Sequence, residues 1–275
     1  MPPPQTPPTS IAQRRLLARI QRRYHTLTET ITLAGGSYPF TRIADPNRVL
    51  SDVAAAEDRL EKTSGLRKNG EELHLPYWAE LWDSALGLSQ LLIDRFGKRE
   101  IAPRTPSPPH PVTPPPCRVL DLGCGMGFPG MIAASLGLPV LFADLEPPAL
   151  LFAKLNSLAY QTPTRTRQLD WQTTKLGEQF DLILGADILY ERKQWESLER
   201  FWRTHLAPGG SAILGEPGRQ TGDNFPVWIR SCGWNVTLHE QRIATRSRPI
   251  RLFEIRLPPS LPTHSYSPAF TPVPS

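Results

Sequence analysis

Apolar runs of strand length alternate with stretches of helical spacing from residue 117 onward. Seven such runs occur, and the longest of them, FDLILGADILY, shows no regular polar alternation. A strand that is apolar on both faces is typical of a parallel sheet covered by helices on each side. The last two runs, WNVTLHEQRI and RPIRLFEIRL, are close enough in sequence to pair as a hairpin, so one of them should be antiparallel to the rest. The alternation therefore predicts an α/β fold with a mostly parallel sheet, helices on both faces and an antiparallel C-terminal hairpin.

A smaller set of elements precedes this pattern. IAQRRLLARIQRRYHTL has helical spacing, and TETITLAGGSYPFTRIAD is typical of two strands joined at the Gly-Gly pair. Asp45-Pro46 then predicts the start of a second helix. LPYWAELWDSALGLSQLLIDRF predicts a third helix, with Trp78 and Trp82 near one face. We therefore expect an N-terminal extension that consists of a helix, a β-hairpin and a helix.

Proline divides the chain. Nineteen of its 31 prolines fall in residues 1–10, 102–116 and 258–275, and such stretches are typical of extended or disordered segments. We interpret the middle stretch as a surface insertion, because the helix before it and the strand after it belong to one set of motifs. The predicted organisation is listed here in chain order: a tail at 1–10, the N-terminal extension at 11–74, the core domain at 75–257 with its insertion at 102–116, and a tail at 258–275.

Composition excludes several classes of protein. The formal net charge of +5 comes from residues 1–28, which hold five arginines and no acid, so the remainder is balanced and no nucleic-acid binding is expected. No apolar run is long enough to span a membrane. Three scattered cysteines do not suit a disulfide framework or a zinc site, and they favour a reducing, cytoplasmic compartment. We expect no metal and a monomer.

The arginine-rich segment near the N-terminus has three interpretations. It is a solvated helix packed on the domain, a docking element for an acidic partner or membrane surface, or a transit-like presequence. The proline cluster before it argues against the presequence, and no unbroken apolar core follows a basic start, as a secretory signal would need.

A glycine-rich turn follows the first core strand. Gly123, Gly125 and Gly127 let the backbone turn tightly and let a ligand approach it. With Gly130, the last two also fit the dinucleotide-binding pattern G-x-G-x-x-G, and glycines can serve packing alone. Asp121 discriminates between these readings, because a carboxylate before the glycines would repel a pyrophosphate. It suits a ligand with a cationic amino-acid part, such as S-adenosylmethionine (SAM).

Two further acids follow the next strands. Asp144, in LFADLEP, is placed to accept hydrogen bonds from ribose hydroxyls, and Glu146 is an alternative. In Asp170-Trp171 the carboxylate can accept from an adenine amino group and the ring can cover the base. A tryptophan after a strand is otherwise a core residue.

The strongest buried strand ends in Asp187-Ile188-Leu189-Tyr190. Open α/β sheets bind ligands beyond the carboxyl ends of their strands, so Asp187 and Tyr190 lie where a substrate nitrogen could meet a methyl group. The alternative is that Asp187 caps the next helix. Glu216 follows another strand at the same edge.

The ordered set DLGCGMG, Asp144, Asp170-Trp171, Asp187-x-x-Tyr190 and LAPGG resembles the class I, seven-β-strand SAM-dependent methyltransferases over about residues 75–257. PYWAELWDSALGLSQLL and ADILYER resemble segments of the protein-lysine methyltransferases related to nicotinamide N-methyltransferase. LGEPGR is similar to a segment of enzymes that methylate lysines of the electron-transfer flavoprotein β-subunit. The resemblance implies a Rossmann-like seven-stranded sheet.

The resemblance also implies an activity, namely methyl transfer from SAM to a lysine ε-amine of a protein. Asp187 would orient the amine, Tyr190 would wall the pocket, Glu216 would help to attract the cation, and Trp82 would pack by the cofactor. The alternatives are a small amine or heterocycle as acceptor, an NAD-linked oxidoreductase, and a non-catalytic binding module of the same fold.

Overall fold

The computed structural model describes residues 10–64, 76–97 and 117–258. The predicted proline-rich insertion at 102–116 lies outside the described residues, and so do all but one residue of each predicted tail. The division of the chain into domains therefore stays a prediction.

A seven-stranded sheet forms the centre of the molecule, in the order β5-β4-β3-β6-β7-β9-β8. Only β9 is antiparallel to the other strands of this described sheet, because it pairs antiparallel with both β7 and β8. The predicted α/β sheet and its antiparallel hairpin are thus confirmed. The strands are β3 (Val119–Leu122), β4 (Val140–Asp144), β5 (Thr164–Gln168), β6 (Phe180–Ala186), β7 (Leu206–Glu216), β8 (Asn235–Gln241) and β9 (Ile250–Arg256).

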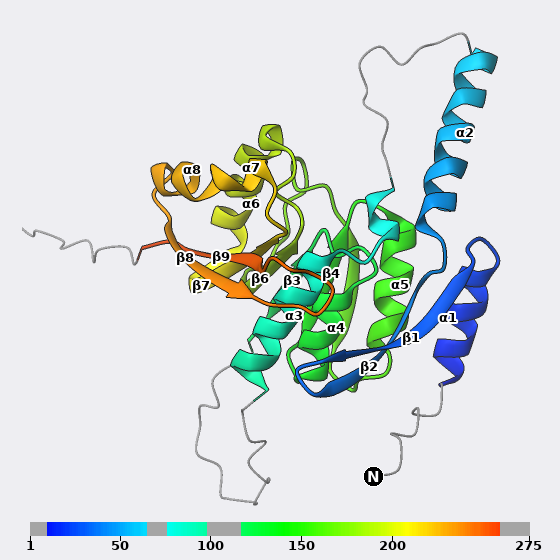
Figure 1. Ribbon diagram of the computed structural model, residues 1–275, viewed down its shortest axis with the longest axis horizontal. Coiled ribbons are helices and arrows are strands. Elements are labelled where there is room, and N and C mark those ends of the chain that lie inside the picture. Colours follow the sequence, from blue (N-terminus) through cyan, green and yellow to red (C-terminus); the bar gives the residue numbers. More distant parts are fainter. Residues whose placement is uncertain (1–9, 65–75, 98–116, 259–275) are drawn as a thin grey trace, which may run out of the picture.

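Helices cover both faces of this sheet (Figure 1). Strand β6 shows why its sequence is apolar throughout: Leu182 and Leu184 face one core cluster, while Ile183 faces the other. The first cluster lies under α3 (Asp83–Phe96), α4 (Phe128–Ser135) and α5 (Pro147–Ser157). The second lies under α6 (Trp195–His205) and α8 (Phe225–Ser231), and the short helices η2 (Arg192–Gln194) and α7 (Gln220–Asp223) connect these elements.

The N-terminal elements form a separate two-stranded sheet with a helix on either side in sequence. These elements are α1 (Ile11–Gln21), β1 (Thr26–Leu33), β2 (Gly36–Ile43) and α2 (Pro46–Ser64). The hairpin turn falls on Ala34 and Gly35, which both have positive φ, rather than on the predicted Gly-Gly pair. Gly36 instead begins β2, where a Cβ atom would meet the hydroxyl oxygen of Tyr38 at 2.6 Å.

The predicted helix over LPYWAELWDSALGLSQLLIDRF is wrong in its first part. A single 3-10 turn, η1 (Tyr77–Ala79), precedes an extended stretch, and α3 begins only at Asp83. The indole N–H of Trp82 donates to the carbonyl of Tyr77 at 2.9 Å, which holds the chain in this bent path. Asp83 then opens the helix, where a carboxylate is favoured by the helix dipole.

One buried amide joins the N-terminal hairpin to the core. Asn156 on α5 accepts from the N–H of Thr41 at 2.9 Å and donates to the carbonyls of Thr41 and Met126, both at 3.0 Å. Met126 lies within the glycine-rich loop, and its Sδ accepts from the N–H of Ile43 at 3.4 Å. The hairpin is therefore fixed to the loop that follows β3.

Candidate functional site

The predicted site residues gather at one edge of the sheet. Strands β3 to β7 are mutually parallel, so their carboxyl ends lie along the same edge. The predicted acids lie at or directly after the ends of these strands: Asp121, Asp144, Asp170, Asp187 and Glu216. Four of them are buried, and Asp170 is only partly so. This edge is the candidate active site.

The loop after β3 needs its glycines for two different reasons. Gly123, Gly125 and Gly127 all have positive φ, so side chains would strain the turn. Gly127 also lies against α5, where a Cβ would approach that of Ala153 to 2.6 Å. Gly123 faces Ile188 and the ring of Trp171, whereas Gly125 faces only the backbone of Trp78. The glycines serve the turn and the packing of the fold at once.

Asp121 lies beneath this loop and is 1% exposed. Its Oδ2 accepts from the N–H of Gly130 at 2.9 Å, but its buried Oδ1 has no hydrogen-bond partner. Burial raises the pKa of Asp121 to about 8, and the nearby charge of Asp144 adds to the rise. The carboxyl group therefore retains an acceptor that nothing within the described chain satisfies.

Asp144 at the end of β4 is fixed by two backbone donors. Its Oδ2 accepts from the N–H of Gly125 at 2.8 Å, and its Oδ1 accepts from the N–H of Glu146 at 2.9 Å. Burial raises the pKa of Asp144 to about 6, against the effect of these donors. The next residue, Leu145, exposes 38% of its surface. An oriented carboxylate and an exposed apolar side chain thus lie next to each other beside the glycine loop.

The pair Asp170-Trp171 forms a compact turn after β5. Oδ1 of Asp170 accepts from the N–H of Gln172 at 2.8 Å, and Oδ2 accepts from the hydroxyl of Thr173 at 3.1 Å. The ring of Trp171 packs toward Gly123, while its buried indole N–H has no partner. Asp170 therefore orders this turn, and Trp171 lies between the core and the glycine loop.

Asp187 follows β6 in a left-handed conformation, with φ of 59°. Its N–H donates to the carbonyl of Gly215, which holds the chain in this sharp turn. Its carboxylate accepts two hydrogen bonds from the guanidinium of Arg219, at 2.5 and 2.9 Å. Burial raises the pKa of Asp187 to about 6, although Arg219 opposes the rise. Asp187 does not begin a helix, because the 3-10 helix η2 starts only at Arg192.

Aromatic rings surround this ion pair. The ring of Tyr77 makes edge contacts with those of Tyr190 and Trp82, at centroid distances of 5.8 and 6.2 Å. The guanidinium of Arg219 lies 5.6 Å from the centre of the Trp82 ring. Burial raises the pKa of Tyr190 to about 12, so its hydroxyl remains protonated at neutral pH. Trp82, predicted to pack by the cofactor, contacts this aromatic group.

Glu216 at the end of β7 is 2% exposed and fully engaged. Its Oε2 accepts from Nε of Arg251 at 2.8 Å and from the N–H of Gly218 at 2.9 Å. Its Oε1 accepts from the N–H of Arg219. The carboxylate therefore fixes the turn that carries Arg219.

The sequence reasoning missed the basic half of this site. Arg219 was part of the quoted LGEPGR segment, but it received no role, and Arg251 lies on a strand far away in sequence. A third arginine, Arg246, donates to the carbonyl of Pro217 at 2.8 Å and pairs with Asp83 at 3.5 Å. Acidic residues at the ends of strands indicate that basic partners are present. The spacing of the acids in the sequence does not indicate which arginines those partners are.

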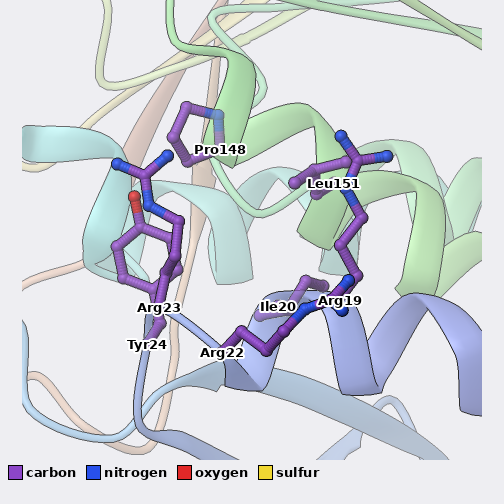
Figure 2. Close-up of a pocket in the computed structure, with 7 residues that line it drawn as sticks. All are labelled: Arg19, Ile20, Arg22, Arg23, Tyr24, Pro148 and Leu151. Carbon is purple, nitrogen blue, oxygen red and sulfur yellow. The ribbon is translucent and has the colours of Figure 1, made fainter.

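A cavity away from this edge lies beside α1, as Figure 2 shows. It has a volume of about 270 Å³ and lies between the end of α1 and the start of α5. Its lining combines arginines with apolar side chains: Arg19, Ile20, Arg22, Arg23, Tyr24, Pro148 and Leu151. Buried Ile20 packs α1 on the domain, as the first interpretation of this segment holds. The ring of Tyr24 contacts that of Trp78 at 5.6 Å, and the backbone of Trp78 in turn faces Gly125 of the glycine loop.

The described residues contain neither a cluster of metal ligands nor a membrane-spanning helix. In residues 10–64, 76–97 and 117–258, no three side chains of His, Cys, Asp or Glu come together as metal ligands would. The three cysteines form no disulfide. None of the helices in the same ranges has the length and apolar character that crossing a membrane requires.

The part of the chain that contains the candidate active site resembles known proteins. Residues 67–223 fit the family described as lysine methyltransferase. Protein N-lysine methyltransferase METTL21A of Danio rerio is 32% identical over 146 residues, which are 50% of this chain and 58% of that protein. The electron transfer flavoprotein beta subunit lysine methyltransferase of the same organism is 29% identical over 150 residues, 52% of this chain and 51% of that protein. The chain thus spans little more than half the length of these relatives.

Among solved structures, a TehB-like SAM-dependent methyltransferase from Corynebacterium glutamicum matches 74% of this chain and 99% of its own, with 19% identity and a TM-score of 0.45. The family match is the more direct finding, because it covers more than half of the chain and contains the glycine loop, Asp144 and Asp187. The protein belongs to the lysine methyltransferase family.

Proposed function

We propose that this protein transfers a methyl group from SAM to the ε-amine of a lysine in a protein substrate. The observation that carries the proposal is the shared edge at which two different carboxylates are held. Asp144 is bonded to the glycine loop, and Asp187 lies among aromatic rings two strands away. Membership of the lysine methyltransferase family supports the choice of acceptor.

The residues around the glycine loop suit the donor. SAM carries a ribose, an adenine and a cationic methionine end, and when bound it supplies an electrophilic methyl group on a sulfonium. The spare acceptor of Asp121 suits the methionine end, as predicted for its carboxylate. Asp144 is oriented to accept from ribose hydroxyls, with Glu146 adjacent. Exposed Leu145 offers an apolar surface to a base.

The adenine contacts proposed from the sequence involve Asp170 and Trp171. The unpartnered indole N–H of Trp171 and the ordered carboxylate of Asp170 both remain available for further hydrogen bonds. Gly123, Gly125 and Gly127 hold the backbone in a tight turn beside these groups. We therefore retain all these residues as the donor site.

On the acceptor side, Asp187 and Tyr190 are the residues that meet the lysine. Methyl transfer needs a neutral amine held in line with the methyl group, and little acid–base catalysis once that geometry is reached. Asp187 accepts a hydrogen bond from the amine, and the rings of Tyr77, Trp82 and Tyr190 exclude water from it. Glu216 acts through the turn it holds and is a positioning residue.

The cysteine content supports an enzyme of the cytoplasm, and the charge balance of residues 29–275 supports one that does not bind nucleic acid. The monomeric state is proposed with them. These finer assignments belong to the same proposal.

The proposal is tested by separating donor binding from transfer. Tritium from labelled SAM is expected to enter protein in a lysate of the source cells, and mass spectrometry of the labelled band should find methyl-lysine. Asp187→Asn should abolish this transfer yet bind SAM within a few-fold of the wild type in isothermal titration. Asparagine is chosen over alanine because it tolerates the positive φ at this position. Asp144→Ala should instead weaken SAM binding by about 1–3 kcal/mol.

Asp181→Asn is the matched control, because this partly buried acid pairs with Arg118 near the opposite end of the same strand. If the tritium label appears only in small molecules, the methyl acceptor is a small amine rather than a protein lysine. Tight binding of NAD without binding of SAM would refute the assignment of SAM as the methyl donor.

A further inference from the structure

Arginines compensate the acids on the acceptor side of the site. Asp187 is paired with Arg219, Glu216 with Arg251, and Asp83 with Arg246, at shortest distances of 2.5, 2.5 and 3.5 Å. Asp223 shares Arg251 at 2.6 Å and is largely exposed. The ring of Tyr190 contacts that of Tyr77 in the same space, and the Tyr190 hydroxyl is uncharged at neutral pH because burial raises its pKa to about 12. A lysine that reaches Asp187 therefore meets a carboxylate whose charge is already balanced.

Arg219 is held in this position from both ends. Its N–H donates to Glu216, and its carbonyl accepts from Arg251 at 3.1 Å. Its guanidinium makes the two hydrogen bonds to Asp187 and lies over the Trp82 ring. The Asp187 side chain is 6% exposed, whereas that of Arg219 is 37% exposed. The cation thus faces the open side of the pair, from which a substrate would come.

The charge state of the acceptor decides the reaction. A lysine amine is normally protonated at neutral pH, and an ammonium has no lone pair with which to attack. A nearby positive charge and removal from water both favour the neutral amine, as in enzymes that use a lysine beside a second cation. An unpaired carboxylate would do the opposite, because it stabilises the ammonium.

We propose that Arg219 is a positioning residue that neutralises Asp187, so that the pocket accepts the substrate lysine as a neutral amine rather than as an ammonium. The lysine proton leaves to water as the amine enters. The nitrogen lone pair then forms the new N–C bond while the S–C bond pair returns to sulfur, and the remaining extra proton on nitrogen is lost to water. This inference rests on the proposed function. It assigns to Arg219 the preference of the pocket for the neutral form of the lysine amine.

The pH dependence of transfer tests this role. The rate of tritium incorporation from labelled SAM into lysate protein is measured between pH 7 and 9.5 for the wild type, Arg219→Gln, Arg219→Lys and Arg200→Gln. Arg219→Gln should be about tenfold slower at pH 7.5 and should recover toward the wild-type rate by pH 9.5, since loss of one cation shifts an amine by about one pKa unit or more. Arg219→Lys keeps the charge and should keep the wild-type profile.

Arg200 on α6 is the matched control, because it is an exposed arginine outside the candidate site whose guanidinium donates to the hydroxyl of Ser197. An equal loss for Arg219→Gln at every pH would assign Arg219 a merely structural role and overturn the proposal. Faster transfer at pH 7.5 would also overturn it, because Arg219 would then be a competitor of the lysine.

A second measurement needs no turnover. n-Butylamine serves as a probe of the lysine side chain, and its binding to the SAM-loaded protein is followed through the indole N–H signal of Trp82. Binding to the wild type should tighten about tenfold per pH unit between pH 7.5 and 9.5, whereas Arg219→Gln should bind the probe equally well across this range. A pH-independent wild type would contradict the inference. Absence of transfer at any pH, with this titration intact, would instead refute the proposed function alone.

Discussion

Asp121 illustrates at the scale of one residue how a ligand site differs from a site optimised for stability. One of its carboxyl oxygens is bonded to Gly130 and the other is buried without a partner. A buried acceptor that lacks a partner costs about 1–3 kcal/mol. The fold tolerates this cost at the point where a ligand is proposed to bind.

Replacement of Asp121 by asparagine should stabilise the ligand-free protein at alkaline pH. The folded pKa of about 8 lies above the ordinary value of 3.8, so the contribution of this group to stability is complete below about pH 4 and is lost as the pH rises through 8. Asp121→Asn cannot ionise. In urea unfolding it should exceed the wild type by about 1–3 kcal/mol at pH 8, and by less at pH 5.

Asp181→Asn is the comparison at both pH values, because the side chain of that acid is 44% exposed. A gain for Asp121→Asn that is the same at both pH values would mean that the missing partner, rather than the charge, sets the cost.

The sequence specified the acids of the site better than their partners. Asp121, Asp144 and Asp187 could be located because each lies within one residue of the end of an apolar strand, and strand ends in a parallel sheet share one edge. Arg219 and Arg251 could not be assigned, because an ion pair depends on side-chain directions after folding. The polar contacts of Glu216 likewise depend on the turn that follows it.

At the scale of elements, the N-terminal hairpin is attached to the core by polar contacts as well as by apolar packing. Asn156 makes three hydrogen bonds that join β2 to the glycine-rich loop. Its side-chain amide can satisfy one donor and two acceptors because it offers both kinds of group. No hydrophobic pattern marks such a residue, so the hairpin was predictable whereas its attachment was not.

Asn156→Ala should lower the free energy of unfolding by about 2–4 kcal/mol, because it leaves buried backbone groups of Thr41 and Met126 without partners. Amide exchange should accelerate most in β2 and in the glycine-rich loop. Asn235→Ala is the control, since this asparagine is exposed on the edge strand β8. Acceleration spread evenly over the sheet would contradict a local attachment.

Element boundaries were predicted less accurately than the elements themselves. The helix expected to begin before Trp78 begins instead at Asp83, because the indole of Trp82 bonds to Tyr77 and bends the chain. Periodicity could not reveal this, since the tryptophans also fit a helical face. The bend places Tyr77 beside Tyr190, where both rings belong to the candidate site.

At the scale of the molecule, Glu254 joins one helix to two strands. This residue of β9 is 6% exposed and accepts from Arg95 of α3, His239 of β8 and Arg256. Burial alone would raise the pKa of Glu254, but these donors outweigh it and lower the pKa to about 2. The ionised carboxylate therefore supports the packing of α3 against the strand pair.

Acid should weaken the protein through this residue. Because the folded pKa lies below the ordinary value of 4.5, the stabilisation is complete above pH 4.5 and is lost as the pH falls toward 2. Glu254→Gln should be about 1–3 kcal/mol less stable than the wild type at pH 7, and the difference should shrink between pH 4.5 and 2. Thermal unfolding across this range measures it.

Glu178→Gln is the comparison, because its pair with Arg165 lies at the surface and should contribute less than about 1 kcal/mol. A difference for Glu254→Gln that persists unchanged at pH 2 would assign its effect to packing rather than to charge.

The position of β9 between β7 and β8 also has a consequence for biosynthesis. Among the described strands, β8 pairs only with β9, which leaves the ribosome after it. Strands β3 to β7 of the nascent chain can therefore pair as they emerge. Strand β8 stays unpaired until β9 inserts between β7 and β8. During that interval a chaperone has an extended segment to shield, and a stalled translation product would expose it to other chains.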